Sequence, residues 1–291
     1  MSLLLLALPF IGVAAVGLLL SVGLSRVDPF RSARYSYGML VISMLSALPY
    51  CLYLIAGLLA QVPLPGQSLH DLLHSNDVHT SSTGLIGFVA LVGIILGVTR
   101  SLALLMARKR LIAACGSDGV MVVESVGLYA YAMPGPTQTI VVSRALTDAL
   151  TDEELDVVLA HERAHVRLRH DRALLVGNLC VTFLPFMRPL VKRLEYALER
   201  IADEAAVRSC GNRNLVAGTL AKTVLFDQTP HVAMGISRTG VTGRVLSLRG
   251  SREPKSNVVE VMVPAALLVA LSLAVVQWHH IVSATRVICG A

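Results

Sequence analysis

Long apolar runs constrain this chain more than any other feature of its sequence. Four segments approach or exceed the roughly 20 apolar residues that a helix needs to cross a bilayer. They run from about Leu3 to Leu24, Tyr37 to Ala60, Leu85 to Met106 and Val258 to Trp278. Only 15% of the residues are charged, against about 25% in a typical soluble domain. The sequence therefore predicts a mainly α-helical, polytopic membrane protein with four transmembrane helices.

The positions of Lys and Arg predict the orientation, because cytoplasmic loops carry an excess of both. Three arginines follow the first run, whereas residues 61–84 contain neither Lys nor Arg. The third run is followed by Arg108, Lys109 and Arg110 and then by an arginine-rich region. In a bacterial-type plasma membrane we expect both termini outside and residues 107–257 in the cytoplasm. This topology explains the net charge of +6, so we expect no direct nucleic-acid partner.

Between the third and fourth runs the pattern changes to that of a folded domain. Two β-branched runs, Gly119–Ser125 and Thr139–Ser143, predict a small sheet or hairpin. A helix then begins at Thr151, which can form a capping box with Glu154. The chain divides accordingly into a membrane region (1–106), a cytoplasmic α+β domain (107–257) and a last span with a short tail (258–291).

The predicted helix carries an H-E-x-x-H sequence at residues 161–165. Because His161 and His165 are four residues apart, they lie on one helical face and can bind one Zn²⁺. Glu162 lies beside them and can take a proton from an attacking water and pass it to the leaving amine. The alternative is a surface helix with two solvated histidines. The helix-start signal and a candidate third ligand favour the metal site.

Glu199 is the candidate third ligand. A catalytic zinc takes three protein ligands and keeps one position open. Glu199 and Asp203 are four residues apart on a second predicted helix. We expect Glu199 to bind the metal and Asp203 to hydrogen-bond a ligand histidine. The alternative is that both carboxylates are solvated, since this helix is charged throughout.

An apolar run at 173–187 lies between the two motifs. If it crossed the membrane once, His161 and Glu199 would lie on opposite sides and could not share a metal. We therefore predict a buried helix or a re-entrant hairpin, membrane-associated near 173–190, that turns near Pro185 and Pro189 and keeps both motifs in the cytoplasm.

Several of these motifs resemble the membrane metallopeptidases of the BlaR/MecR type, which are antirepressor proteases of beta-lactam resistance signalling. The similar segments are T-I-V-V-S-R-A-L (139–146), T-D-E-E-L-D-V-V-L-A-H-E-R-A-H (151–165), R-H-D (169–171) and E-x-x-x-D (199–203). The more distant HtpX-like and CAAX-processing metallopeptidases share the H-E-x-x-H and E-x-x-x-D pair. The position of the catalytic loop between the third and fourth spans favours the BlaR type.

This resemblance implies a zincin-like (gluzincin) protease domain in which His161, His165 and Glu199 bind zinc and Glu162 is the general base. It also implies that the substrate is a cytosolic transcriptional repressor, typically a winged-helix dimer, which a homodimeric protease would suit. Self-cleavage within the cytoplasmic loop is a second option. The sensors of this family carry a penicillin-binding domain after the fourth span, whereas only residues 279–291 follow here. We therefore expect a different stimulus or a separate sensor.

Three functions compete at this point: a regulatory zinc endopeptidase, an HtpX-like quality-control protease, and a non-catalytic scaffold or receptor that keeps the metal motif for folding. Tyr196, His231 and Arg244 are candidate donors to an oxyanion. The strand Thr139–Ser143 either holds the substrate backbone at a sheet edge or is purely structural.

Other features carry weaker expectations. His170 lies off the ligand face of the helix, and we expect it not to bind the metal. The outer-loop histidines at 70, 74 and 79 are expected to be solvated. The stretch 228–255 is expected to be a mobile or loosely helical connection.

Overall fold

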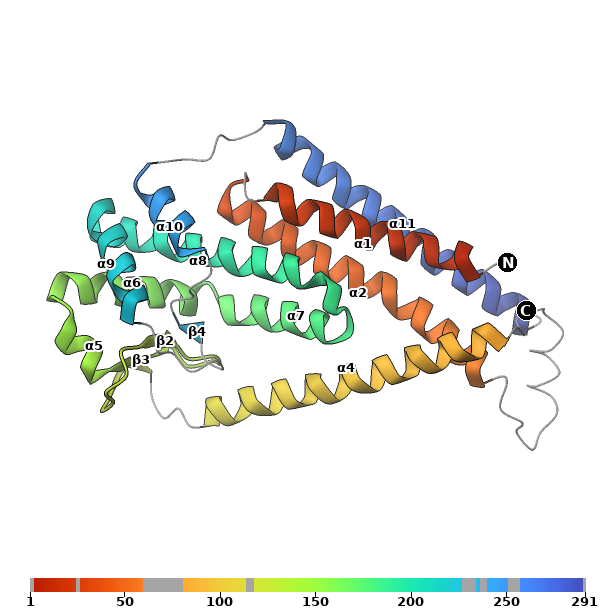
Figure 1. Ribbon diagram of the computed structural model, residues 1–291, viewed down its shortest axis with the longest axis horizontal. Coiled ribbons are helices and arrows are strands. Elements are labelled where there is room, and N and C mark those ends of the chain that lie inside the picture. Colours follow the sequence, from red (N-terminus) through yellow and green to blue (C-terminus); the bar gives the residue numbers. More distant parts are fainter. Residues whose placement is uncertain are drawn as a thin grey trace.

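The computed structural model describes residues 3–24, 27–59, 81–113, 118–226, 234–235, 240–250 and 257–289. Four long helices form a bundle along the long axis of the molecule (Figure 1). They are α1 (Leu3–Gly23), α2 (Pro29–Leu59), α4 (Ser81–Ala113) and α11 (Asn257–Cys289). The start of α1 and the end of α11 lie at one end of the bundle, and a small sheet with short helices lies at the other (Figure 1).

Three segments of these helices are long and apolar enough to cross a membrane: Pro29–Ile55, Leu85–Ala113 and Met262–Ser283. The described part of α1 contributes the shorter apolar stretch Ala7–Gly23. The second, third and fourth predicted spans are therefore found, whereas the first, at Leu3 to Leu24, is not confirmed. Large apolar side chains such as Leu85 and Val89 are exposed on α4, as expected of a helix that faces lipid.

The apolar run between the two motifs folds as a helical hairpin inside the bundle. Helix α7 (His170–Phe183) is followed by the 3₁₀ turn η2 (Pro185–Met187) and by α8 (Arg188–Cys210). Proline suits the first turn of a helix because its missing N–H would have no partner there, and α8 has one in its first turn. Met187 at the turn is fully buried against Gly17 of α1. The chain thus turns back near Pro185, as predicted, and both motifs lie at the same end of the bundle.

Helix α7 lies along one half of α4. A Cβ atom at Gly97 would overlap the ring of Phe183. Ser101 Oγ lies 2.9 Å from Thr182 Oγ1. At 1.5 Å per residue, Gly97 is about 16 Å along α4 from Arg108, which is roughly half the thickness of a bilayer core. The hairpin therefore reaches the middle of the apolar segment of α4.

The sheet has four strands in the order β1-β3-β2-β4. They are β1 (Gly119–Val123), β2 (Ala130–Ala132), β3 (Thr139–Ser143) and β4 (Met234–Gly235). β1 pairs with β3 in parallel, whereas β2 is antiparallel to both β3 and β4.

This topology decides between alternatives that the sequence left open. The two β-branched runs form a sheet and not a hairpin, because the connection between them folds back as β2 and leaves β1 and β3 parallel. The strand at 139–143 is not a sheet edge: it has a neighbour on each side, and all five of its residues are buried. Its role is structural, and the strand nearer the metal motif is β2.

Short helices complete the domain around the sheet: α5 (Arg144–Ala149), α6 (Asp152–Arg167), α9 (Arg213–Phe226) and α10 (Val241–Leu248). The predicted capping box starts α6: Thr151 N–H donates to Glu154 Oε2 at 3.0 Å, and Glu154 N–H donates to Thr151 Oγ1 at 3.3 Å. A second apolar core joins the sheet to these helices. Within the stretch 228–255, residues 234–235 form β4 and residues 241–248 form α10. The rest of the predicted connection, at 228–233, 236–239 and 251–255, lies outside the described residues.

The contact between α4 and α7 predicts how the stability of the protein changes when one methyl group is added at Gly97. We expect Gly97→Ala to lower the free energy of unfolding by about 1–3 kcal/mol, because the added methyl group overlaps the Phe183 ring. Gly93→Ala is the matched control, since a Cβ there meets nothing within 4 Å. Thermal unfolding in detergent micelles measures both. Equal midpoints for the two variants would contradict this packing.

Candidate metal centre

Small side chains let α6 and α8 approach each other closely at this end of the bundle. Three buried alanines form a cluster of their own between the helices: Ala164, Ala202 and Ala205. Short side chains reduce the distance between helix axes, so nearby longer side chains from both helices can reach a common point. His161 and His165 on α6 and Glu199 on α8 do so.

These three side chains present their ligand atoms to one another. Nε2 of His161 lies 3.1 Å from Nε2 of His165. The Glu199 oxygens Oε2 and Oε1 lie 3.6 Å and 3.5 Å from the nitrogens of His161 and His165, respectively. Ligands at about 2.0–2.1 Å from a tetrahedral zinc are about 3.3 Å apart. The spacing therefore suits zinc.

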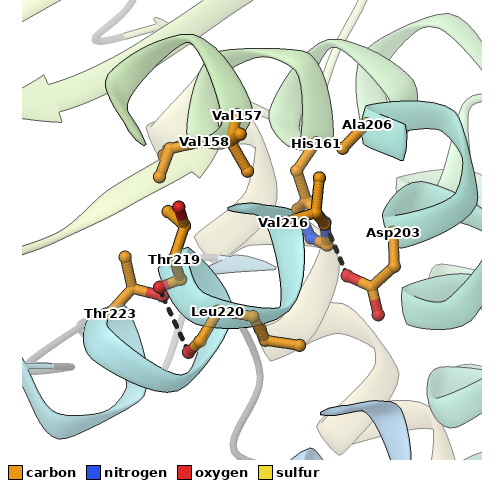
Figure 2. Close-up of a pocket in the computed structure, with 9 residues that line it drawn as sticks. All are labelled: Val157, Val158, His161, Asp203, Ala206, Val216, Thr219, Leu220 and Thr223. Atoms are coloured by element: carbon orange, nitrogen blue, oxygen red, sulfur yellow. Dashed lines mark hydrogen bonds and ion pairs between the residues drawn. The ribbon is translucent and has the colours of Figure 1, made fainter. Parts of the chain in front are cut away.

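Asp203 orients His161 from the other side of the ring. Its Oδ1 lies 3.1 Å from Nδ1 of His161, and Figure 2 shows this contact beside a small cavity between α6 and α9. The contact places a proton on Nδ1 and directs Nε2 at the other ligands. Burial acts to lower the pKa of His161, but hydrogen bonds with Asp203 and Glu199 outweigh it and raise that pKa to about 10.

His170 holds the second histidine in a different way. Its Nδ1 lies 2.9 Å from Nδ1 of His165. Between the two helices Arg169 adopts a left-handed conformation with φ of 52°, which breaks the helix ahead of His170. Burial lowers the pKa of His170 to about 4 and that of His165 to about 3. Both rings are neutral at pH 7, and a neutral imidazole is what a metal requires.

Glu162 lies beside the ligands and is fully buried. Its Oε2 accepts a hydrogen bond of 2.8 Å from the backbone N–H of Ala132 in β2. In the described part of the chain its Oε1 accepts none. Burial raises the pKa of Glu162 to about 8. A carboxylate with a pKa near neutrality and one oxygen without a partner is suited to proton transfer.

Arg244 reaches the site from α10 and joins two carboxylates of α8. Its Nε and Nη2 donate to Oδ2 and Oδ1 of Asp203 at 2.8 Å and 2.7 Å, and its Nη1 lies 2.7 Å from Oε2 of Glu199. Burial acts to raise the pKa of Glu199, but the charge of Arg244 outweighs it and lowers that pKa to about 2. Arg244 is fully buried and paired with both carboxylates, and its predicted role as a donor to an oxyanion stays a prediction.

Two glycines allow α10 to lie against α8. A Cβ at Gly240 would fall 2.7 Å from the ring of Tyr196, and one at Gly243 would fall 2.9 Å from its hydroxyl. A side chain at either position would push α10, and with it Arg244, away from the site. Tyr196, also predicted as an oxyanion donor, therefore lies against the start of α10, and its role toward a substrate stays a prediction.

Several predicted residues lie outside the described residues. They are His231, the third oxyanion candidate, and the outer-loop histidines at positions 70, 74 and 79.

The charges and the donor set of this cluster suit a divalent cation. Asp203 and Glu199 are buried carboxylates, and in the metal-free protein Arg244 and the protonated His161 balance their two charges. A zinc ion among His161, His165 and Glu199 would displace the His161 proton and supply its own charge instead. The ligand atoms of these three residues lie within 4.8 Å of one another, and two imidazole nitrogens with one carboxylate oxygen are ligands that zinc prefers, so these residues fit the metal.

Residues 103–239 match the model of peptidase family M48. The matched segment includes α6, α8 and all three ligand residues, and the match supports a membrane-type zinc metallopeptidase. The match does not confirm the narrower BlaR/MecR identity. No curated protein and no solved structure matches the chain.

Removal of Arg244 tests the charge balance of the metal centre. We expect Arg244→Met to lower the free energy of unfolding of the metal-free protein by about 3–5 kcal/mol, because Asp203 and Glu199 are left buried without their cation. Zinc should recover part of this loss. Arg249→Met, at the exposed end of α10, is the control. Thermal unfolding with and without a chelator compares them, and an Arg244 variant as stable as the control would refute the ion-pair role.

Zinc binding by the metal-free domain should depend on pH. Since the pKa of His161 is raised to about 10, this ring holds a proton at pH 7 that zinc must displace. We expect zinc affinity to rise as pH increases from 6 to 8, with at least about one proton released per zinc. Calorimetry in buffers of different ionisation enthalpy counts the protons. An affinity that is flat with pH would contradict the assigned state of His161.

Proposed function

We propose that this chain is a membrane-embedded zinc endopeptidase that cleaves protein substrates on the cytoplasmic side of the membrane. The observation that carries the proposal is the His161, His165 and Glu199 group beside the buried Glu162, inside the segment that matches peptidase family M48. The cytoplasmic orientation rests on the distribution of Lys and Arg along the sequence. Helix α6, which carries both histidines, lies with the sheet at the end of the bundle opposite the start of α1 and the end of α11 (Figure 1).

The side chains suggest how the reaction proceeds. A bound zinc would polarise the scissile carbonyl and activate a water. Glu162 has a raised pKa and one oxygen that accepts no hydrogen bond from the described residues. It takes the proton of the attacking water and returns it to the leaving amine. Asp203 and His170 keep the ligand rings in the orientation that points their Nε2 atoms at the metal.

A small hollow beside His165 lies next to the strand β2. It is lined by Ala132, Asp171 and residues of the loop after β2, and its volume is about 10 Å³. The substrate backbone would pair with β2 in the position that β4 takes in the structure, by strand addition. Because Ala132 N–H bonds Glu162, a peptide paired with β2 would pass next to the general base.

Two substrate classes follow from the sequence resemblance and the family match. A cytosolic winged-helix repressor is the proposed substrate if the chain acts as the BlaR/MecR type does. An HtpX-like role in quality control of membrane proteins is equally compatible with the M48 match. Cleavage of a purified winged-helix repressor, against cleavage of an unfolded membrane protein, separates the two.

One further observation favours self-cleavage as a second activity. β4, at residues 234–235, pairs with β2 on the side away from β3. This is the position that a substrate strand would take by strand addition. The chain's own segment therefore lies where we propose that substrates bind.

Substitution of Glu162 tests the proposed enzyme. We expect the purified protein to hold about one zinc and Glu162→Gln to keep it while cleavage falls by about 10²–10⁴-fold, because only the proton carrier is lost. Zinc analysis and gel assays with casein as the probe measure both, and the same gels show any self-cleavage near β4. Glu204→Gln, which removes the surface partner of Arg213, is the control. Undiminished cleavage by the Glu162→Gln variant would remove Glu162 from the mechanism, and absence of zinc would sink the proposal.

A further inference from the structure

Helix α4 is joined to the start of α7 by an ion pair between Arg108 and Asp171. The exposed fractions of the two side chains are only 19% and 14%. A pair this sheltered from water interacts more strongly than an exposed surface pair, which is worth little. It joins the last turns of a membrane-span candidate to the first turn of the hairpin.

The residue before Asp171 is His170, which touches a proposed metal ligand. His170 is 3% exposed, and its Nδ1 lies 2.9 Å from Nδ1 of His165. Because Arg169 is left-handed, α6 does not continue into α7, and the regular helical hydrogen bonds of α6 do not hold His170 in place. The position of His170 therefore depends on where α7 begins.

We propose that Arg108 and Asp171 are positioning residues of the metal centre, which hold the start of α7 so that His170 supports His165. The inference rests on the proposed zinc site. It makes α4, an apolar helix outside the ligand group, part of the support of that site. Such supporting contacts to a metal-ligating histidine commonly change metal affinity by about 10–100-fold when they are lost.

Other contacts of α4 show why a single pair can carry this role. Most of the span Leu85–Ala113 is exposed, so few neighbours hold the helix. Near its start, Gly87 packs against the backbone of Leu54 in α2. Toward its other end it is held by α7 through Phe183, Thr182 and Asp171. A tilt of α4 about its contact with α2 would therefore displace the start of α7 through the Arg108–Asp171 pair.

Zinc affinity of the full-length protein in detergent, measured by competition with a chelator, tests this proposal. We expect Arg108→Met to weaken zinc binding by about 10-fold or more, and Arg108→Lys to recover part of it. The reversed pair Arg108→Asp with Asp171→Arg should bind more tightly than Asp171→Arg alone. Lys109→Met is the matched control, since Lys109 is the exposed neighbour of Arg108.

Thermal unfolding of each metal-free variant separates positioning from general loosening of the fold. Gly97→Ala, which disturbs the same helix pair further along, should lower the unfolding midpoint with little change in zinc affinity. Equal zinc affinity of the Arg108→Met, Lys109→Met and unmodified proteins would overturn the inference and leave the protease proposal intact. An unmodified protein that binds no zinc would remove both.

Discussion

The structure depends on bringing two imidazoles and a carboxylate to one point. The imidazoles are on α6 and the carboxylate is on α8, and an apolar segment of nearly membrane-spanning length separates the two motifs in the sequence. The α7–α8 hairpin meets this condition, because it enters the bundle and returns to the same end. The alanine contact between α6 and α8 then brings His161, His165 and Glu199 together. Without that return, H-E-x-x-H and E-x-x-x-D could not share a metal, and neither the sheet nor α10 would have a site to support.

Much of this arrangement is predictable because it follows from local periodicity. A spacing of four residues places His161 and His165 on one helical face, and Glu199 and Asp203 on another. The capping box at Thr151 is equally local. The hairpin is predictable for a different reason: a shared metal forbids a single crossing between the motifs.

Other features depend on contacts between distant segments, which no local pattern records. His170 falls off the ligand face of a continuous helix, and only the left-handed Arg169 brings it against His165. The β2 strand has three residues, too few to show an alternating pattern. Arg244 belongs to a stretch rich in Gly, Arg and Ser that predicts a loose connection. The one available signal was the pair Gly240 and Gly243 just before it, which marks a close helix contact.

The two ligand histidines are hydrogen-bonded by different kinds of residue, and these residues come from different parts of the chain. His161 rests on Asp203, a carboxylate that Arg244 neutralises from α10. His165 rests on a neutral imidazole at the start of α7. The M48 match ends at residue 239, so Arg244 lies beyond the matched segment although it contacts two carboxylates of the site.

The place of Arg244 in the chain has a consequence for the order of synthesis. Proteins are made from the N-terminus onward, and domains begin to fold as they emerge. The guanidinium that contacts Asp203 and Glu199 emerges well after both motifs and shortly before α11. A nascent chain that already contains H-E-x-x-H and E-x-x-x-D therefore still lacks α10 and this ion pair. The complete centre can form only after residue 244 has left the ribosome.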